Sequence, residues 1–389
     1  MGIFNTRYLS KEQLQGFDNY KYSAVDTSPL AVYISHPFWN WLVNFYPLWI
    51  APNLLTVCGW LMVMLGFVVV SFLDYDLNSN SLSESKSTLP IPNEVWLFCA
   101  ICTFLGHTLD GTDGKQARRT GTSGPTGELF DHGLDSWSTV PFTVTIFSVF
   151  GRGEFSVNAT HLLCILISVQ IVFIVTHWEK YNTGILFLSW GYDASQYGLT
   201  AFYLLAYLVG YEWFKFYVFG ELTFARCMEI GFYVCCVLSL LMSLYNIYKS
   251  YPNIYEACLP MLPAILLFSA TLIWANYSPS ILIERDPRSF FWTMGTVFSH
   301  IACRLIVAQM SHTRAAAINN LLIFYCIAVA VSVSGILTAI AELYFLRAVA
   351  VIVTVAHLHY GICVVRQLCR HFNIYAFSLS YLDTGKRRE

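Results

Sequence analysis

About ten apolar stretches, each roughly 20 residues long, follow one another along this chain. A helix needs about 20 predominantly apolar residues to cross the hydrocarbon core of a bilayer. The stretches lie at residues 53–73, 95–119, 126–150, 158–178, 196–219, 227–249, 255–275, 290–311, 317–340 and 341–366. The pattern predicts an all-α fold, a polytopic membrane bundle of about ten transmembrane helices.

The composition agrees with a membrane protein and excludes other classes. Of the 389 residues, 56% are hydrophobic. Only 12% are charged, about half the share in an ordinary soluble protein. A net charge of −2 gives no strong attraction to a polyanion, so a nucleic-acid partner is not expected. The Cys99-x-x-Cys102 motif lies inside an apolar stretch, where small apolar filler is a better interpretation than a redox or zinc site.

The distribution of Lys and Arg orients the predicted helices. If the N-terminus is cytosolic, the cytosolic segments carry more basic residues than the opposite side, which favours both termini inside. The two glycosylation sequons, at Asn158 and Asn276, then fall on the outer side. We therefore expect residues 107–137, between the second and third spans, at the cytosolic face.

Residues 30–50 are rich in aromatic side chains but form too short an apolar run to cross a bilayer. Pro37 and Pro47 bracket Phe38, Trp39, Trp41, Leu42, Phe45 and Tyr46. This density favours an amphipathic helix in the membrane interface. The alternative is a buried cap on the bundle.

One polar segment, residues 107–137, interrupts the apolar pattern and reads HTLDGTDGKQARRTGTSGPTGELFDHGLDSW. Asp110 and Asp113 are three residues apart, and Asp131 and Asp135 are four apart, so each pair shares a helix face. Two antiparallel helices joined by residues 120–127 would bring the pairs together. Four carboxylates in such a place require cations between them. Oxygen ligands favour Mg²⁺ or Mn²⁺, and four carboxylates suit two ions about 4 Å apart, the arrangement used for displacement at phosphorus.

Other residues of this segment agree with phosphate chemistry. Gly111 and Gly114 allow a ligand to approach the backbone. Arg118, one turn beyond Gly114, can pair with phosphate oxygens. Gly127 opens the next helix, where free N–H groups favour an anion. The simpler alternative is that the acids only form salt bridges with Lys115, Arg118 and Arg119.

Eight positions follow the pattern D-x2-D-G-x2-A-R-x8-G-x3-D-x3-D: Asp110, Asp113, Gly114, Ala117, Arg118, Gly127, Asp131 and Asp135. In these residues the chain resembles the CDP-alcohol phosphotransferases. The runs DGKQARRT and GELFDHG resemble the eukaryotic choline and ethanolamine phosphotransferases. The runs GFDNYKYSAVDTSPL, HPFWN, APNLLT, HWEKYNTGILF and WGYD are more similar to the ethanolamine-specific branch. The resemblance covers nearly the whole chain.

The resemblance implies a reaction and a location. The 3-hydroxyl of diacylglycerol would attack the β-phosphorus of CDP-ethanolamine, giving phosphatidylethanolamine and CMP. CDP-choline, or both donors, is the alternative, because nothing in the signature distinguishes a primary amine from a quaternary one. The family also implies a homodimer in the membrane of the endoplasmic reticulum, or the Golgi, with its active site facing the cytosol. A remote alternative is a divalent-cation transporter, although the acids cluster at one face and no inverted repeat is evident.

Residue roles follow by position. The resemblance makes Asp110, Asp113 and Asp131 metal ligands, with Asp135 completing the set. It assigns the donor's phosphates to Arg118, and the substrate site to the other signature positions Gly114, Ala117 and Gly127. Asn53, in the APN motif, resembles a CDP-contacting Asn of the family. Its alternative role is a plain N-cap.

The general base is His132 or Asp135. A neutral imidazole accepts a proton near pH 7, whereas a metal-bound carboxylate is a weak base, so His132 is the stronger candidate. Glu128, one turn before His132, would orient it or contact donor or acceptor. The residues that end the fourth span are expected either to line a head-group pocket or to form an ordinary helix terminus: His177, Glu179, Lys180, Tyr181 and Asn182.

These expectations divide the chain into four segments. Residues 1–52 form a cytosolic segment with the interfacial helix, and residues 53–219 form the catalytic helices. Residues 220–366 form the remaining transmembrane helices, for lipid access or dimer packing. Residues 367–389 form a cytosolic tail.

Overall fold

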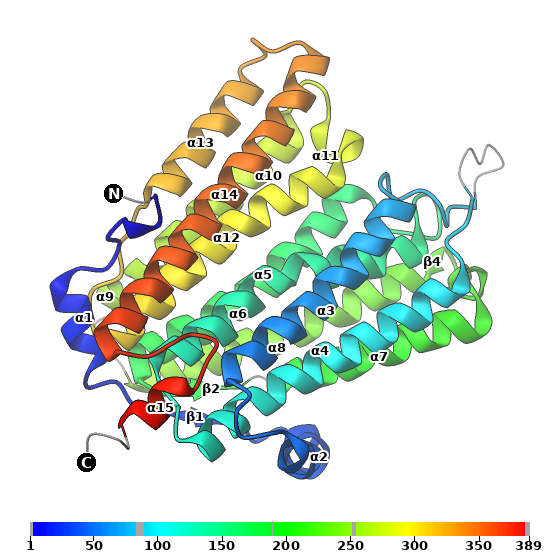
Figure 1. Ribbon diagram of the computed structural model, residues 1–389. Helices are drawn as coiled ribbons and strands as arrows, with labels where there is room; N and C mark the ends of the chain where they lie inside the picture. Colours follow the sequence, from blue (N-terminus) through cyan, green and yellow to red (C-terminus); the bar gives the residue numbers. More distant parts are fainter. Residues whose placement is uncertain (1–2, 83–88, 189, 251–253, 386–389) are drawn as a thin grey trace.

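Long helices lie side by side in one bundle (Figure 1). The computed structural model describes residues 3–82, 89–188, 190–250 and 254–385. The long helices are α3 (Pro52–Leu73), α4 (Asn93–Thr120), α5 (Pro125–Phe150), α6 (Ala159–Thr183), α7 (Gly191–Val209), α8 (Phe224–Ser250), α10 (Leu262–Tyr277), α12 (Pro287–Met310), α13 (Asn320–Val333) and α14 (Ala339–Phe372). The short helices are α1 (Lys11–Phe17), α2 (His36–Leu42), α9 (Ile254–Cys258), α11 (Leu282–Arg285) and α15 (Ser380–Gly385).

The described residues contain very little sheet. β1 (Ala24–Val25) pairs in parallel with β2 (Leu186–Phe187), with Ala24 opposite Leu186. β3 (Tyr217–Phe219) pairs antiparallel with β4 (Leu222–Thr223). The first pair ties the N-terminal segment to the end of α6, and the all-α fold class is confirmed.

A long helix occupies each of the ten apolar stretches. Seven of them in the described chain are long and apolar enough to cross a membrane, and α5, α7 and α13 fall outside that set. α13 has 14 residues, about 21 Å of helix against roughly 30 Å of hydrocarbon. α7 ends at Val209 rather than near residue 219 because Gly210 adopts φ +81° and a short helical turn and β3 follow.

The turn between α4 and α5 sets the geometry of the polar segment. Gly121 adopts φ +67°, in the left-handed region, and the Thr122 N–H donates to the Ala117 carbonyl at 2.9 Å. Pro125 is the first residue of α5, where its missing N–H costs nothing. The two helices therefore run antiparallel and bring residues 110–113 beside residues 131–135.

The core of the bundle is built around α12, which packs against α5, α6 and α14. Phe291, Met294, Val297 and Phe298 of α12 have no exposed surface. α3, α4, α5 and α7 form the neighbouring group of helices that holds the polar segment.

The N-terminal helix α2 lies across the bundle. Figure 1 views α2 nearly along its axis, whereas the bundle helices run across the view. Trp39 is buried against α4, while Trp41, Phe45 and Trp49 are 57%, 66% and 74% exposed. Arg119 of α4 donates to the backbone carbonyls of Val43 and Tyr46, which holds this segment in place. This segment therefore packs one face on the bundle and exposes aromatic side chains on the other, as expected of an interfacial helix.

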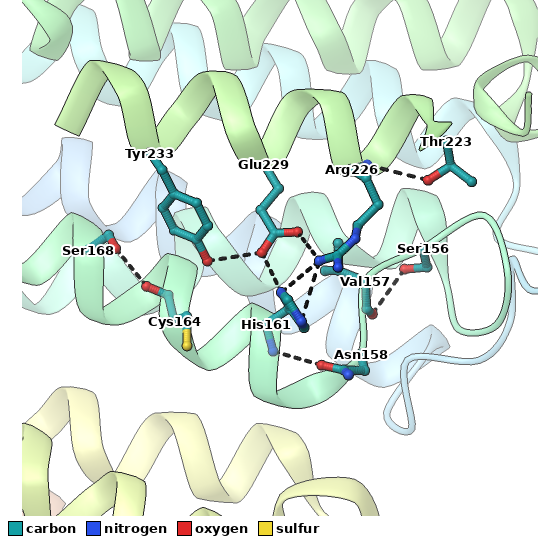
Figure 2. Close-up of polar contacts among 10 residues, drawn as sticks. All are labelled: Ser156, Val157, Asn158, His161, Cys164, Ser168, Thr223, Arg226, Glu229 and Tyr233. Atoms are coloured by element: carbon teal, nitrogen blue, oxygen red, sulfur yellow. Dashed lines mark hydrogen bonds and ion pairs between the residues drawn. The ribbon is translucent and has the colours of Figure 1, made fainter. Parts of the chain in front are cut away.

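A buried carboxylate joins α8 to α6 near the start of both helices. Glu229, 4% exposed, accepts hydrogen bonds from Arg226 at 2.6 Å and Tyr233 at 3.0 Å, and contacts His161 Nδ1 at 2.6 Å (Figure 2). All of these are partners within the protein, so structural pairing accounts for this intramembrane acid.

Candidate active site

Four aspartates from α4 and α5 gather at the end of the bundle near α2. One carboxylate oxygen each from Asp110, Asp113 and Asp131 lie within 4.8 Å of one another. Asp131 and Asp135 form a second such group with His132. Asp131 belongs to both groups, so the two predicted pairs form one cluster.

The aspartate cluster has no Lys or Arg partner among the described residues. No ion pair there joins any of the four aspartates to Lys or Arg. Arg119 instead donates to backbone carbonyls and to Gln116, and the Lys115 ammonium lies 6.0 Å from the Trp39 ring. The contacts therefore do not favour the alternative in which the aspartates only form salt bridges with Lys115, Arg118 and Arg119. A set of oxygen ligands without a cation of its own fits Mg²⁺ or Mn²⁺.

Two hydroxyl groups that the sequence reasoning missed orient the carboxylates. Tyr192 of α7 donates to Asp110 Oδ2 at 3.0 Å, and Thr56 of α3 donates to Asp113 Oδ2. Such contacts fix the rotamers of candidate ligands. The only sequence signals were the position of Thr56 one turn after Asn53 and the WGYD run that contains Tyr192.

The three glycines near the cluster differ in what surrounds them. A Cβ on Gly111 would lie 2.4 Å from the Trp39 ring, so Gly111 is needed for helix packing. The sequence suggested instead that Gly111 lets a ligand approach the backbone. A Cβ on Gly114 would meet only Arg118 Nη1 at 3.7 Å, and one on Gly127 only Asn53 Oδ1 at 3.6 Å. The space beside Gly114 and Gly127 is the space that a phosphate-bearing ligand would need.

Asn53 and Arg118 lie at the same end of the bundle. Asn53 is the second residue of α3, after the N-cap Ala51, so the N-cap alternative is wrong. Its Nδ2 donates to the carbonyl of Ala376 at 2.9 Å. Arg118 is exposed on the last turn of α4, one residue after Ala117, and its side chain makes no hydrogen bond or ion pair within the described chain.

His132 is buried beside the aspartates with one nitrogen unpaired. Its Nδ1 lies 3.9 Å from Asp131 Oδ2, and its ring packs edge-on against His177 with the centroids 5.0 Å apart. Nε2 has no hydrogen-bond partner in the described part of the structure. This arrangement leaves Nε2 available to accept a proton.

Glu128 is engaged by residues other than His132. Its two oxygens accept hydrogen bonds from Lys180 and from the Tyr20 hydroxyl, and Lys180 also donates to Tyr20 at 2.9 Å. Lys180 and Glu128 are almost completely buried. Burial, followed by the Glu128 carboxylate, raises the pKa of Tyr20 well above its usual value, so Tyr20 stays protonated and donates.

The polar side chains at the end of α6 fall into two groups, those that contact site residues and those with structural contacts only. His177 and Lys180 contact His132 and Glu128. Glu179 accepts from Asn246 at 2.6 Å, Asn182 donates to the Trp178 carbonyl at 2.9 Å, and Tyr181 accepts from the Ala315 N–H at 3.2 Å. These contacts join α6 to α8 through Glu179, lie within α6 for Asn182, and join α6 to the loop before α13 through Tyr181, so the last three side chains have structural partners.

Comparisons with known proteins agree with this geometry. Residues 49–227 match the model of a family described as CDP-alcohol phosphatidyltransferase. The chain is 45% identical over 382 residues to ethanolaminephosphotransferase 1 of Mus musculus, covering 96% of this chain and 94% of the relative. The same identity and coverage hold for ethanolaminephosphotransferase 1 of Homo sapiens. Choline/ethanolaminephosphotransferase 1 of Arabidopsis thaliana is 28% identical over 400 residues, covering 96% and 98%.

Proposed function

The chain belongs to the CDP-alcohol phosphatidyltransferase family, and from that membership we propose that it transfers phosphoethanolamine from CDP-ethanolamine to the 3-hydroxyl of diacylglycerol. The products are phosphatidylethanolamine and CMP. The observation that carries the proposal is the cluster of Asp110, Asp113, Asp131 and Asp135 in a near-full-length relative of two ethanolaminephosphotransferases. The lower identity to the choline/ethanolamine enzyme favours ethanolamine over choline or dual specificity.

Different residues of the site have different roles in the proposed reaction. Asp110, Asp113, Asp131 and Asp135 are the residues that would hold two divalent ions. Mg²⁺ or Mn²⁺, when bound, neutralises the pyrophosphate and the charge that develops on the departing CMP. Arg118 pairs with the donor's phosphate oxygens, and Asn53 contacts the CDP moiety. Gly114, Ala117 and Gly127 keep the space for the phosphates clear.

His132 acts as the general base. The acceptor oxygen forms a bond to the β-phosphorus while the bond from that phosphorus to the CMP oxygen breaks. The hydroxyl proton passes to Nε2 of His132, the nitrogen without a partner. Glu128 acts through its pairing with Lys180, which fixes the first turns of α5 against α6. Asp135 is the competing candidate for the base.

We extend the proposal to the location of the enzyme in the cell. We infer a multi-pass protein of the endoplasmic reticulum, or the Golgi, with the aspartate cluster facing the cytosol, where the water-soluble donor is found. Residues 53–219 are the catalytic helices, residues 220–366 serve lipid access and dimer packing, and residues 1–52 and 367–389 are cytosolic. A homodimer is part of this proposal.

The direct test uses purified protein with diacylglycerol, Mg²⁺ or Mn²⁺, and each CDP-alcohol in turn, with CMP release as the readout. We expect turnover with CDP-ethanolamine to exceed that with CDP-choline. Asp131→Asn should lower turnover by about a hundredfold or more, since it removes the ligand shared by both groups. Glu154→Gln, a change at an exposed acid, is the matched control. Full turnover by Asp131→Asn, or Mn²⁺ uptake into proteoliposomes without CMP release, would contradict the proposal.

A further inference from the structure

A cavity opens from the aspartate cluster into the interior of the bundle, between α3, α4, α5 and α7. Asp110, Asp131 and Asp135 line it at one end, and Trp60, Tyr192 and Gln196 line it as well. The cavity volume is about 20 Å³, enough for a group of about the size of a water molecule, and further space is open to solvent. No Lys or Arg is among the described residues that line it. His107, which contacts Asp193, is among the lining residues. A cavity with several carboxylates and no Lys or Arg favours a cation.

Two buried polar atoms of the residues that line this cavity lack a hydrogen-bond partner in the described structure, the donor Trp60 Nε1 and the acceptor Gln196 Oε1. Gln196 is the one of the two that can accept from a cationic ligand. It is 7% exposed, and its Oε1 has no hydrogen-bond partner in the described structure. A buried amide oxygen without a donor is unfavourable, so a ligand that supplies the donor accounts for it. The amide oxygen can only accept, so that ligand must carry an N–H or O–H group.

The position of Gln196 relates it to the reacting phosphate. Tyr192, which donates to Asp110, lies four residues earlier on α7. Gln196 is therefore one turn further along the helix, roughly 6 Å along its axis. A two-carbon linker on a phosphate held at the aspartates can cover such a distance. Trp60 and Tyr192 add aromatic rings, which also attract a cation.

We propose that Gln196 accepts a hydrogen bond from the primary ammonium of CDP-ethanolamine and thereby selects against CDP-choline. This inference rests on the proposed function. An ammonium group has three N–H donors, whereas the trimethylammonium of choline has none and would leave Gln196 unpaired. A site built to hydrogen-bond its substrate rejects an analogue that lacks the donor. The end of α6 was expected to be either a head-group pocket or an ordinary helix terminus, and no residue of segment 177–182 is among the described residues that line the cavity.

The test is a donor series with zero, one, two and three N-methyl groups on the ethanolamine nitrogen. Each methyl group removes one N–H donor, so kcat/KM of the wild-type enzyme should fall along the series. In Gln196→Leu the ratio of kcat/KM for CDP-ethanolamine to that for CDP-choline should fall by about tenfold. The change should appear mainly in KM for the donor, with KM for diacylglycerol unchanged.

Two further variants separate recognition from packing. Gln170→Leu is the matched control, because Gln170 on α6 is also buried, with an Oε1 that has no partner in the described structure, but is not among the residues that line the cavity. Its donor ratio should equal that of the wild type, since a ratio cancels any loss of folded protein. Gln196→Glu keeps an acceptor oxygen and should keep the preference for CDP-ethanolamine.

The outcomes are distinct. An unchanged donor ratio in Gln196→Leu, an equal fall in Gln170→Leu, or a fall in Gln196→Glu as large as that in Gln196→Leu would overturn the role of Gln196. A wild-type enzyme that prefers CDP-choline would overturn it too. A wild-type protein that releases CMP from no donor would instead refute the proposed function.

Discussion

Gly111 and Gly114, three residues apart on α4, have different reasons to be glycine. Both were expected to admit a ligand, yet only Gly114 has open space beside it. The sequence alone could not distinguish the roles of the two glycines, because the ring that covers Gly111 belongs to Trp39, more than 70 residues earlier in the chain. Thr56 and Tyr192 escaped the sequence analysis for the same reason, since their contacts with Asp113 and Asp110 exist only after α3 and α7 pack on α4.

Gly111→Ala should destabilise the protein while Gly114→Ala does not. The added Cβ at Gly111 overlaps the Trp39 ring, and overpacking of this kind costs about 1–3 kcal/mol. Thermal unfolding in detergent should show a lower Tm for Gly111→Ala alone. Gly114→Ala should keep the wild-type Tm and raise KM for the donor. Equal Tm values for both variants would contradict the distinction.

Lys180→Met should be among the most destabilising single changes near the site. It leaves the buried Glu128 carboxylate without its partner, and breaking a buried pair costs about 3–5 kcal/mol. The double variant Glu128→Gln with Lys180→Met should recover part of that loss, as a double-mutant cycle of Tm values would measure. Additive losses in the double variant would show that the two side chains act independently.

At the scale of elements, the sequence predicted which helices exist better than it predicted where each helix begins and ends. The Gly/Ser/Thr/Pro content of residues 120–127 correctly predicted the turn that joins α4 and α5. The fifth apolar stretch, residues 196–219, extends beyond the end of α7 at Val209, because the aromatic residues after Gly210 are apolar enough to continue the pattern. The ninth yielded only the short helix α13. Hydropathy counts apolar residues, but it does not detect where a glycine with positive φ ends a helix.

The attachment of α8 to α6 gives a prediction for an element far from the chemistry. Glu229→Gln removes the charge that Arg226 pairs with, in the cluster of Figure 2. Since Arg226 is 41% exposed, part of its charge is solvated, and we expect a loss of about 1–3 kcal/mol. Turnover per folded molecule should stay at the wild-type level. A loss of specific activity without a change in Tm would instead give this cluster a role in the reaction.

The whole molecule was predictable as a class: an all-α membrane bundle with an interfacial helix and one concentrated acidic site. What sequence could not provide is the packing of helices that are distant in the chain. The placement of α12 at the core and of α7 beside α4 depends on tertiary contacts. The cavity next to the aspartates depends on the same contacts, and so it became visible only in three dimensions.

Divalent ions should stabilise the folded protein as a whole. Four carboxylates held together repel one another, and an ion that binds only the folded state adds about 2.7 kcal/mol at a concentration 100 times its Kd. Mn²⁺ should therefore raise Tm, and EDTA should reverse the shift. Asp131→Asn should greatly reduce the shift, and Glu154→Gln should retain it. A Tm independent of Mn²⁺ in the wild type would argue against a metal site.

Segments from the N-terminal and C-terminal parts of the chain make contacts with each other and with Asn53. The backbone N–H groups of Tyr8 and Leu9 donate to Gln367, and Asn53 donates to the carbonyl of Ala376. On the ribosome, the aspartates of α4 and α5 are therefore inserted long before residues 367–376 have been made. The contact between Asn53 and Ala376 forms only after residue 376 has been made, so a nascent chain carries the full aspartate signature before it carries this contact.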